Sequence, residues 1–146
     1  MTDASPIVIV VKQSFQQSAE RVFDAWLDVK AAAKFMFATE TGTMVKCEID
    51  PRVGGGFVMT DRRPEGEVEH TGTYLTIDRP HRLVFTFGIP AFSSDVDLVT
   101  VEITPLSRGC DLTLTTEMNP QWAEYEELAR EGWTKILASL AATLNH

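Results

Sequence analysis

The chain has few cysteines and no motif that binds metal through them. Cys47 and Cys110 are its only cysteines, and they form neither a CxxC pair nor another spacing typical of metal ligands. This argues against a zinc site and against a disulfide framework. Both fall on segments with alternating apolar residues, so we interpret them as small core residues.

Basic residues and long apolar runs are also scarce. The 13 Lys and Arg residues are outnumbered by 21 Asp and Glu, which gives a formal net charge of -8. Nucleic-acid binding depends on a broad positive field, so we expect no nucleic-acid partner. The longest apolar run is residues 7–11, far short of the roughly 20 residues of a membrane helix, and no basic segment precedes it as in a signal peptide. We therefore expect a cytoplasmic protein with no membrane partner.

The length and the β patterning predict one domain built around a sheet. A chain of 146 residues is long enough for a core of its own, and we expect a single domain over residues 1–146. Short connectors rich in Gly, Pro and Asp predict antiparallel neighbours. We place the first strand between the second and the seventh, flanked by Cys47 and Cys110. The expected strands are residues 7–15, 44–50, 56–62, 67–77, 82–88, 96–104 and 110–117.

Helical patterns follow the first strand and the last one. Ser18 and Asp28 are expected N-caps of two short helices, and Asn119 with Pro120 predicts the start of a long helix. Gly132 within that helix indicates either a close approach to the sheet or room for another molecule. The apolar stripe of the long helix comprises Tyr125, Leu128, Ala129, Gly132, Trp133, Ile136, Leu137, Leu140 and Leu144.

This order of elements predicts an α+β fold with space inside it. An antiparallel sheet with one apolar face must bury that face, and the long helix is the available partner. A sheet of seven twisted strands curls, and a curled sheet with a helix across it need not be filled by side chains. We therefore expect a cavity between the sheet and the C-terminal helix.

Five short motifs, in the same order, resemble the family of activator-of-heat-shock-protein-90-ATPase homologues, within the START and Bet v 1-like superfamily. The resemblance covers nearly the whole chain. It implies the helix-grip fold, in which a seven-stranded curved antiparallel sheet wraps around a long C-terminal helix and two short helices follow strand one. At Phe35-Met36-Phe37 the chain departs from the family, whose members often carry a tryptophan there. The motifs are AERVFDAW at residues 19–26, RVGGGF at 52–57, GTY at 72–74, PHRLVF at 80–85 and EGW at 131–133.

The resembled family is functionally mixed, so the fold leaves the function open. Its members include co-chaperone modules, carriers of lipid or aromatic ligands, and distant cyclases and aromatases. In this chain, aromatic and methionine residues concentrate on the elements that would line a helix-grip cavity. We therefore expect a small hydrophobic, aromatic or lipid-like ligand. The candidate ligand-binding residues are Phe35, Phe37, Phe57, Met59, Tyr74, Phe85, Phe87, Phe92, Tyr125 and Trp133.

Two other functions stay open. A co-chaperone-like module with a chaperone partner would need a specific exposed surface, and a polyketide cyclase or aromatase-like enzyme would need an ionisable group with a shifted pKa in the cavity. His70, His81 and His146 are scattered, and no nucleophile lies in a motif such as GxSxG. We interpret Glu67 and Glu69 as part of a solvated strand face. No catalytic residue, metal or cofactor is expected.

Overall fold

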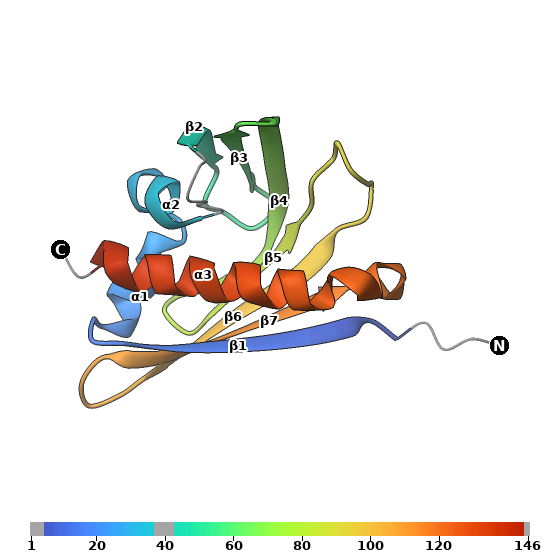
Figure 1. Ribbon diagram of the computed structural model, residues 1–146. Coiled ribbons are helices and arrows are strands. Elements are labelled where there is room, and N and C mark those ends of the chain that lie inside the picture. The colour runs from blue at the N-terminus through green and yellow to red at the C-terminus, as the bar shows by residue number, and fades with distance from the viewer. Residues whose placement is uncertain (1–4, 37–42, 145–146) are drawn as a thin grey trace.

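The computed structural model describes residues 5–36 and 43–144, and its elements follow the expected order (Figure 1). The α+β helix-grip fold is confirmed. The elements are β1 (Ile7–Phe15), α1 (Ala19–Ala25), α2 (Val29–Phe35), β2 (Thr43–Ile49), β3 (Gly56–Arg63), β4 (Gly66–Asp78), β5 (Arg82–Phe87), β6 (Asp97–Pro105), β7 (Cys110–Met118), the 3-10 helix η1 (Pro120–Tyr125) and α3 (Glu126–Leu144).

Within the described residues, the seven strands form one antiparallel sheet in the order β1-β7-β6-β5-β4-β3-β2. The predicted position of the first strand, between the second and the seventh, is therefore wrong. β1 pairs only with β7 at one edge, and β2 pairs with β3 at the other. Two helices separate β1 from β2 along the chain, so no tight turn makes these strands neighbours. Cys47 and Cys110 are both free thiols; Cys110 is buried and Cys47 only partly so.

The helices begin at the predicted caps. The side chains of Ser18, Asp28 and Asn119 accept backbone N–H groups of the first turns at 3.2, 3.0 and 3.0 Å. The long helix differs from expectation in its first residues, which form η1, and the backbone leaves helical geometry at Trp122 (φ -98°, ψ 22°). α3 begins only after this irregular turn.

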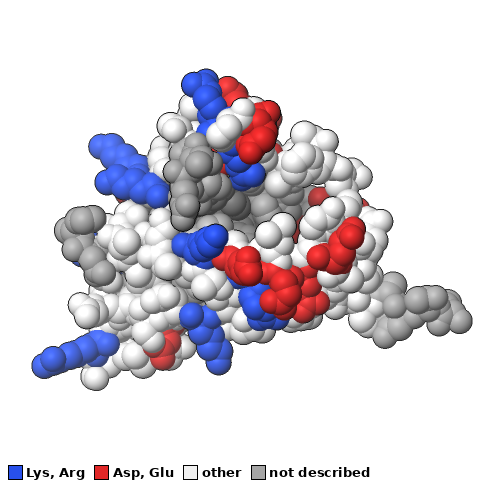
Figure 2. Space-filling model, viewed as in Figure 1, with Lys and Arg blue, Asp and Glu red and all other residues white. Residues whose placement is uncertain are grey.

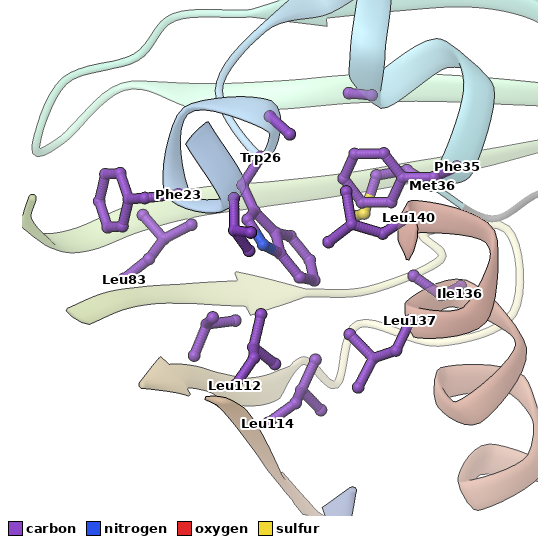
Figure 3. Close-up of a cluster of buried hydrophobic side chains, with 14 of the residues drawn as sticks. Phe23, Trp26, Phe35, Met36, Leu83, Leu112, Leu114, Ile136, Leu137 and Leu140 are labelled. Carbon is purple, nitrogen blue, oxygen red and sulfur yellow. The ribbon is translucent and has the colours of Figure 1, made fainter. Parts of the chain in front are cut away.

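α3 crosses the concave face of the sheet and presents two different sides (Figure 1). Its exposed side is charged, and Figure 2 shows acidic side chains over the part nearer its beginning. Its buried side packs into the core, where Trp26 lies with Leu112 and Leu114 of β7 on one side and Leu140 of α3 on another (Figure 3). None of the described helices is both long and apolar enough to cross a membrane.

The apolar stripe of α3 is buried only from Trp133 onward. Tyr125 and Leu128, near its beginning, are 44% and 65% exposed. Gly132 is exposed as well, and, apart from its chain neighbours and the adjacent helix backbone, no atom of the described residues lies within 4 Å of the place where a Cβ would stand. Of the two alternatives for Gly132, the close approach to the sheet is therefore wrong, and Tyr125 and Leu128 are left exposed.

Gly132→Ala should stabilise the protein by about 1 kcal/mol, because alanine favours a helix interior over glycine and the new methyl group meets nothing. Urea unfolding of both proteins measures this change. Gly72→Ala is the opposing control, since its methyl group would overlap the Phe57 ring and the Thr86 carbonyl and should destabilise. A loss of stability in Gly132→Ala would show that this position is not an open helix surface.

Trp133→Ala should cost about 3 to 5 kcal/mol of unfolding free energy, because Trp133 is 4% exposed and fills the space between α3 and the sheet. Lys135→Ala, an exposed neighbour on the same helix, should change it by no more than about 0.5 kcal/mol. Equal stability of the two variants would contradict the packing described for Trp133.

Candidate functional site: an apolar groove at the start of α3

An open groove of about 680 Å³ lies where the β5–β6 loop faces η1 and the beginning of α3. In Figure 1 the yellow loop and the orange start of the helical segment lie toward the same end of the molecule. Three parts of the chain therefore form the walls. The lining residues are Phe87, Gly88, Ile89, Ala91, Phe92, Ser93, Asp95, Asp97, Met118, Trp122, Tyr125 and Leu128.

Backbone hydrogen bonds shape the loop wall. Just after β5, Gly88 and Thr71 exchange two N–H···O=C bonds of 2.9 Å, which hold the base of the loop against β4. The Ile89 carbonyl then accepts the N–H groups of Phe92 and Ser93 at 2.9 and 3.2 Å. This turn leaves Phe92 73% exposed, as expected for a residue at the tip of the loop.

Asp95 fastens the loop to the opposite wall. Its Oδ2 accepts a hydrogen bond from the Trp122 indole N–H at 3.0 Å and another from the Gln121 side-chain amide. The Trp122 ring lies 5.8 Å from that of Tyr125, centroid to centroid. The bond to Asp95 occurs at the residue where the backbone leaves helical geometry. The groove is thus braced on both sides.

Asp97, the first residue of β6, places a carboxylate in the groove. It stands opposite Phe87 of β5, and strand alternation puts it on the same face as the buried Val99 and Val101. Burial, and next the nearby charge of Asp95, raise the pKa of Asp97 to about 6. Asp97 is therefore mostly charged at pH 7 although its surroundings are largely apolar.

Phe87 connects the groove with the core. Its ring lies 5.7 Å from that of Trp133, edge to face, and 5.8 Å from the stacked His70 ring. His70 is 2% exposed, and its Nδ1 lies 3.2 Å from the Met59 carbonyl oxygen. Because a carbonyl oxygen can only accept a hydrogen bond, Nδ1 carries the proton and donates in this contact. Burial lowers the pKa of His70 to about 4, so this ring is neutral at pH 7. It acts there as an aromatic surface behind Phe87.

The predicted ligand-binding residues divide into two groups. Phe87, Phe92 and Tyr125 line the groove, and Trp133 packs directly behind Phe87. The others that the structure describes are buried in the core, where the Phe85 ring lies 5.7 Å from Phe57, 6.3 Å from Tyr74 and 6.3 Å from Trp26. Phe37 lies outside the described residues. The core group comprises Phe35, Phe57, Met59, Tyr74 and Phe85.

Several groove residues were absent from the predicted set, notably Asp95, Asp97 and Leu128. Asp97 had a signal in the sequence, since alternation places it in register with Val99 and Val101 at the start of an apolar strand face. No local pattern in the sequence indicated Asp95, because its hydrogen-bond partner Trp122 is 27 positions away.

A second hollow, of about 620 Å³, lies over α1 and α2, but its character is different. Its lining includes the charged Glu20, Arg21, Asp24, Lys30 and Lys34. No three His, Cys, Asp or Glu side chains lie close enough to hold a metal ion in the described parts of the chain. The apolar groove beside η1 is therefore the better candidate for a small-molecule site.

Replacing His70 should reduce the sensitivity of the fold to acid. Its folded pKa, about 4, lies below the usual 6.5, so the unfolded chain binds the proton more readily. The contribution of the neutral His70 to the free energy of unfolding is therefore fully present above pH 6.5 and is lost as the pH falls toward 4. Between pH 7 and 4.5, wild type should lose about 2 kcal/mol more than His70→Asn in urea unfolding. The exposed His81→Asn should behave as wild type, and an equal loss in His70→Asn would contradict a buried neutral His70.

Solved structures of several bacterial proteins have the same fold as this chain. Protein CV1439 from Chromobacterium violaceum is 28% identical, with a TM-score of 0.84 over 95% of this chain and 97% of that one. Mll3558 from Rhizobium loti is 26% identical, with a TM-score of 0.78 over 97% and 99%. An AHSA1-like protein from Aeromonas hydrophila is 22% identical, with a TM-score of 0.81 over 95% and 92%. A search of curated proteins gave no match.

The sequence itself matches one family over almost its full length. The family described as "Activator of Hsp90 ATPase homolog 1-like protein" matches residues 16–145, a span that includes all five motifs on which the resemblance rested. The chain therefore belongs to the family of activator of Hsp90 ATPase homolog 1-like proteins.

Proposed function

We propose that the protein binds a small hydrophobic or aromatic molecule in the groove between the β5–β6 loop and the start of α3. One observation carries this proposal: large apolar side chains line an open groove of about 680 Å³ and are themselves exposed, Phe92 by 73%, Leu128 by 65% and Tyr125 by 44%. Ligand pockets in proteins commonly measure about 300 to 1,000 Å³ and are lined mainly by apolar and aromatic side chains. Contiguous exposed apolar surface is typical of a binding site.

The groove is formed before any ligand arrives, which favours binding. Asp95 holds the loop to Trp122 through a 3.0 Å hydrogen bond, and Phe87 rests against the buried Trp133. Walls fixed in this way lose little conformational freedom when a ligand enters. The inner end of the groove continues into the aromatic core through Phe87, so an aromatic ligand would find further ring surface there.

The enzyme hypothesis receives partial support from Asp97. With a pKa of about 6, its carboxyl group is the one best suited to acid–base chemistry in the groove. Asp95, its nearest charged neighbour in the lining, is already engaged by Gln121 and Trp122. A single carboxyl group defines no reaction, so binding without transformation is the function that we propose.

A chaperone partner, which the family description suggests, would use the same exposed side chains in a different way. Phe92 and Leu128 protrude enough to contact a protein surface. A protein partner would depend on these two exposed side chains, whereas a small ligand would also depend on the inner residues Phe87 and Met118.

Ligand binding should appear as a thermal shift in a screen of chemically varied hydrophobic compounds. A ligand at a hundredfold excess over its Kd stabilises the native state by about 2.7 kcal/mol. Leu128→Ser should weaken the hits about tenfold, because it removes an exposed groove wall without touching the core. Leu106→Ser is the matched control, since Leu106 is 49% exposed and lies outside the groove.

Three results would redirect the proposal. A broad library with no stabilising compound would contradict ligand binding and favour a chaperone partner. Equal weakening by Leu128→Ser and Leu106→Ser would place the ligand elsewhere. Turnover of a hit compound, abolished in Asp97→Asn while binding persists, would favour an enzyme.

A further inference from the structure

Asp97 presents an unpartnered carboxylate where the proposed ligand would lie. It lines the groove beside Phe87 and Met118, and no described residue donates a hydrogen bond to its side chain or forms an ion pair with it. Placing a carboxylate in a largely apolar setting costs free energy unless a partner compensates for the lost water. A ligand that carries the missing partner would compensate for that cost.

None of the described residues that line the groove with Asp97 supplies positive charge. β5 contributes Phe87, β7 contributes Met118, and the loop contributes Asp95, which is itself acidic. From η1 and α3 come the uncharged Trp122, Tyr125 and Leu128. Among the described residues that line the groove, none is Lys, Arg or His.

The basic side chain of α3 that is nearest along the chain to the groove residues makes its contacts away from the groove. Arg130 lies within 3.7 Å of both Glu126 and Glu127, and its Nη1 approaches the Val10 carbonyl of β1 at 3.4 Å. Acidic side chains gather over the same part of α3 (Figure 2), and Glu124 of η1 is exposed beside them. The potential at this end of the molecule therefore attracts cations.

Four aromatic side chains line the same groove as the carboxylate. Phe87, Phe92, Trp122 and Tyr125 all line the groove. The face of an aromatic ring attracts a cation within about 6 Å, by about 0.5 to 2 kcal/mol. Rings and a carboxylate in one groove suit an ammonium group better than a neutral or anionic one.

We propose that the groove selects molecules that join an apolar or aromatic body to a positively charged amine, with the ammonium group on Asp97 and the body against Phe87, Tyr125 and Leu128. This inference rests on the proposed ligand-binding function and specifies its ligand class. Carboxylate ligands are disfavoured, because Asp95 and Asp97 would both repel them.

The binding of such an amine should depend on pH. Burial and Asp95 raise the pKa of Asp97 to about 6, so the carboxylate is largely protonated at pH 5 and ionised at pH 7.5. Because the ammonium group pairs with the ionised form, amine affinity should rise over this interval. His70, behind Phe87, has a pKa of about 4 and stays neutral throughout it. A neutral ligand should show no such rise.

Three probes with one apolar body test the selectivity: 5-phenylpentylamine, 5-phenylpentan-1-ol and 6-phenylhexanoate. Calorimetric titration at pH 7.5 should show the amine binding about tenfold more tightly than the alcohol, and the carboxylate most weakly. Asp97→Asn should weaken the amine about tenfold and change the alcohol by no more than about twofold. Glu102→Gln removes the same charge from the opposite face of β6 and should change neither.

The outcomes separate this inference from the proposed function. Equal affinity for amine and alcohol, unaffected by Asp97→Asn, would overturn the amine selectivity and leave apolar binding intact. Library hits that are all neutral or acidic, with no binding of the amine, would do the same. Failure of the three probes together with an empty library screen would contradict both. Binding of the alcohol by Asp97→Asn would show that this variant folds. If the variant does not fold, the amine selectivity is decided by the wild-type ranking of the three probes and by the pH dependence of amine binding.

Discussion

The packing of α3 against the concave face of the sheet is the contact on which the other features depend. From Trp133 to Leu144 the helix buries its apolar side against the core, and Trp133, Leu137 and Leu140 are each at most 4% exposed. The preceding residues continue beyond this packed region, so Tyr125 and Leu128 are left uncovered. The groove is therefore a product of the same helix that closes the core, because α3 is packed along only part of its length.

The β5–β6 loop forms the second wall of the groove over that uncovered end. A loop held only at its two ends would be free to move relative to the helix. Here Asp95 bonds to Trp122 across the groove, while Gly88 is paired with Thr71 at the base of the loop. The bond involves Trp122, the residue of the irregular turn that precedes the start of α3 at Glu126. One hydrogen-bonded contact thus fixes the two walls relative to each other.

The sequence predicted the features that depend on neighbouring residues better than those that depend on distant ones. Strand bounds and the caps at Ser18, Asp28 and Asn119 follow from local patterns, and the structure has them within two residues. The edge position of β1 depends on pairing between distant segments, which alternation does not encode. Periodicity likewise assigned Leu128 and Leu137 to one stripe without showing that only Leu137 is covered. For the same reason the predicted aromatic residues mixed groove and core.

Affinity and selectivity in the groove would come from different residues. Apolar walls such as Leu128 and Phe92 contribute about 25 cal/mol for each Å² they cover, and they contribute it to any ligand of suitable shape. Asp97 would distinguish between the proposed ligands, because its free-energy cost in an apolar setting would be relieved by a cation, left unrelieved by a neutral group and increased by an anion. The net charge of -8 acts in the same direction at longer range, raising the local concentration of cations before contact. That long-range attraction weakens with salt over a Debye length of about 8 Å at physiological ionic strength, whereas the contact between an ammonium group and the half-buried Asp97 is screened much less. Salt should therefore slow the arrival of an amine more than it hastens its departure.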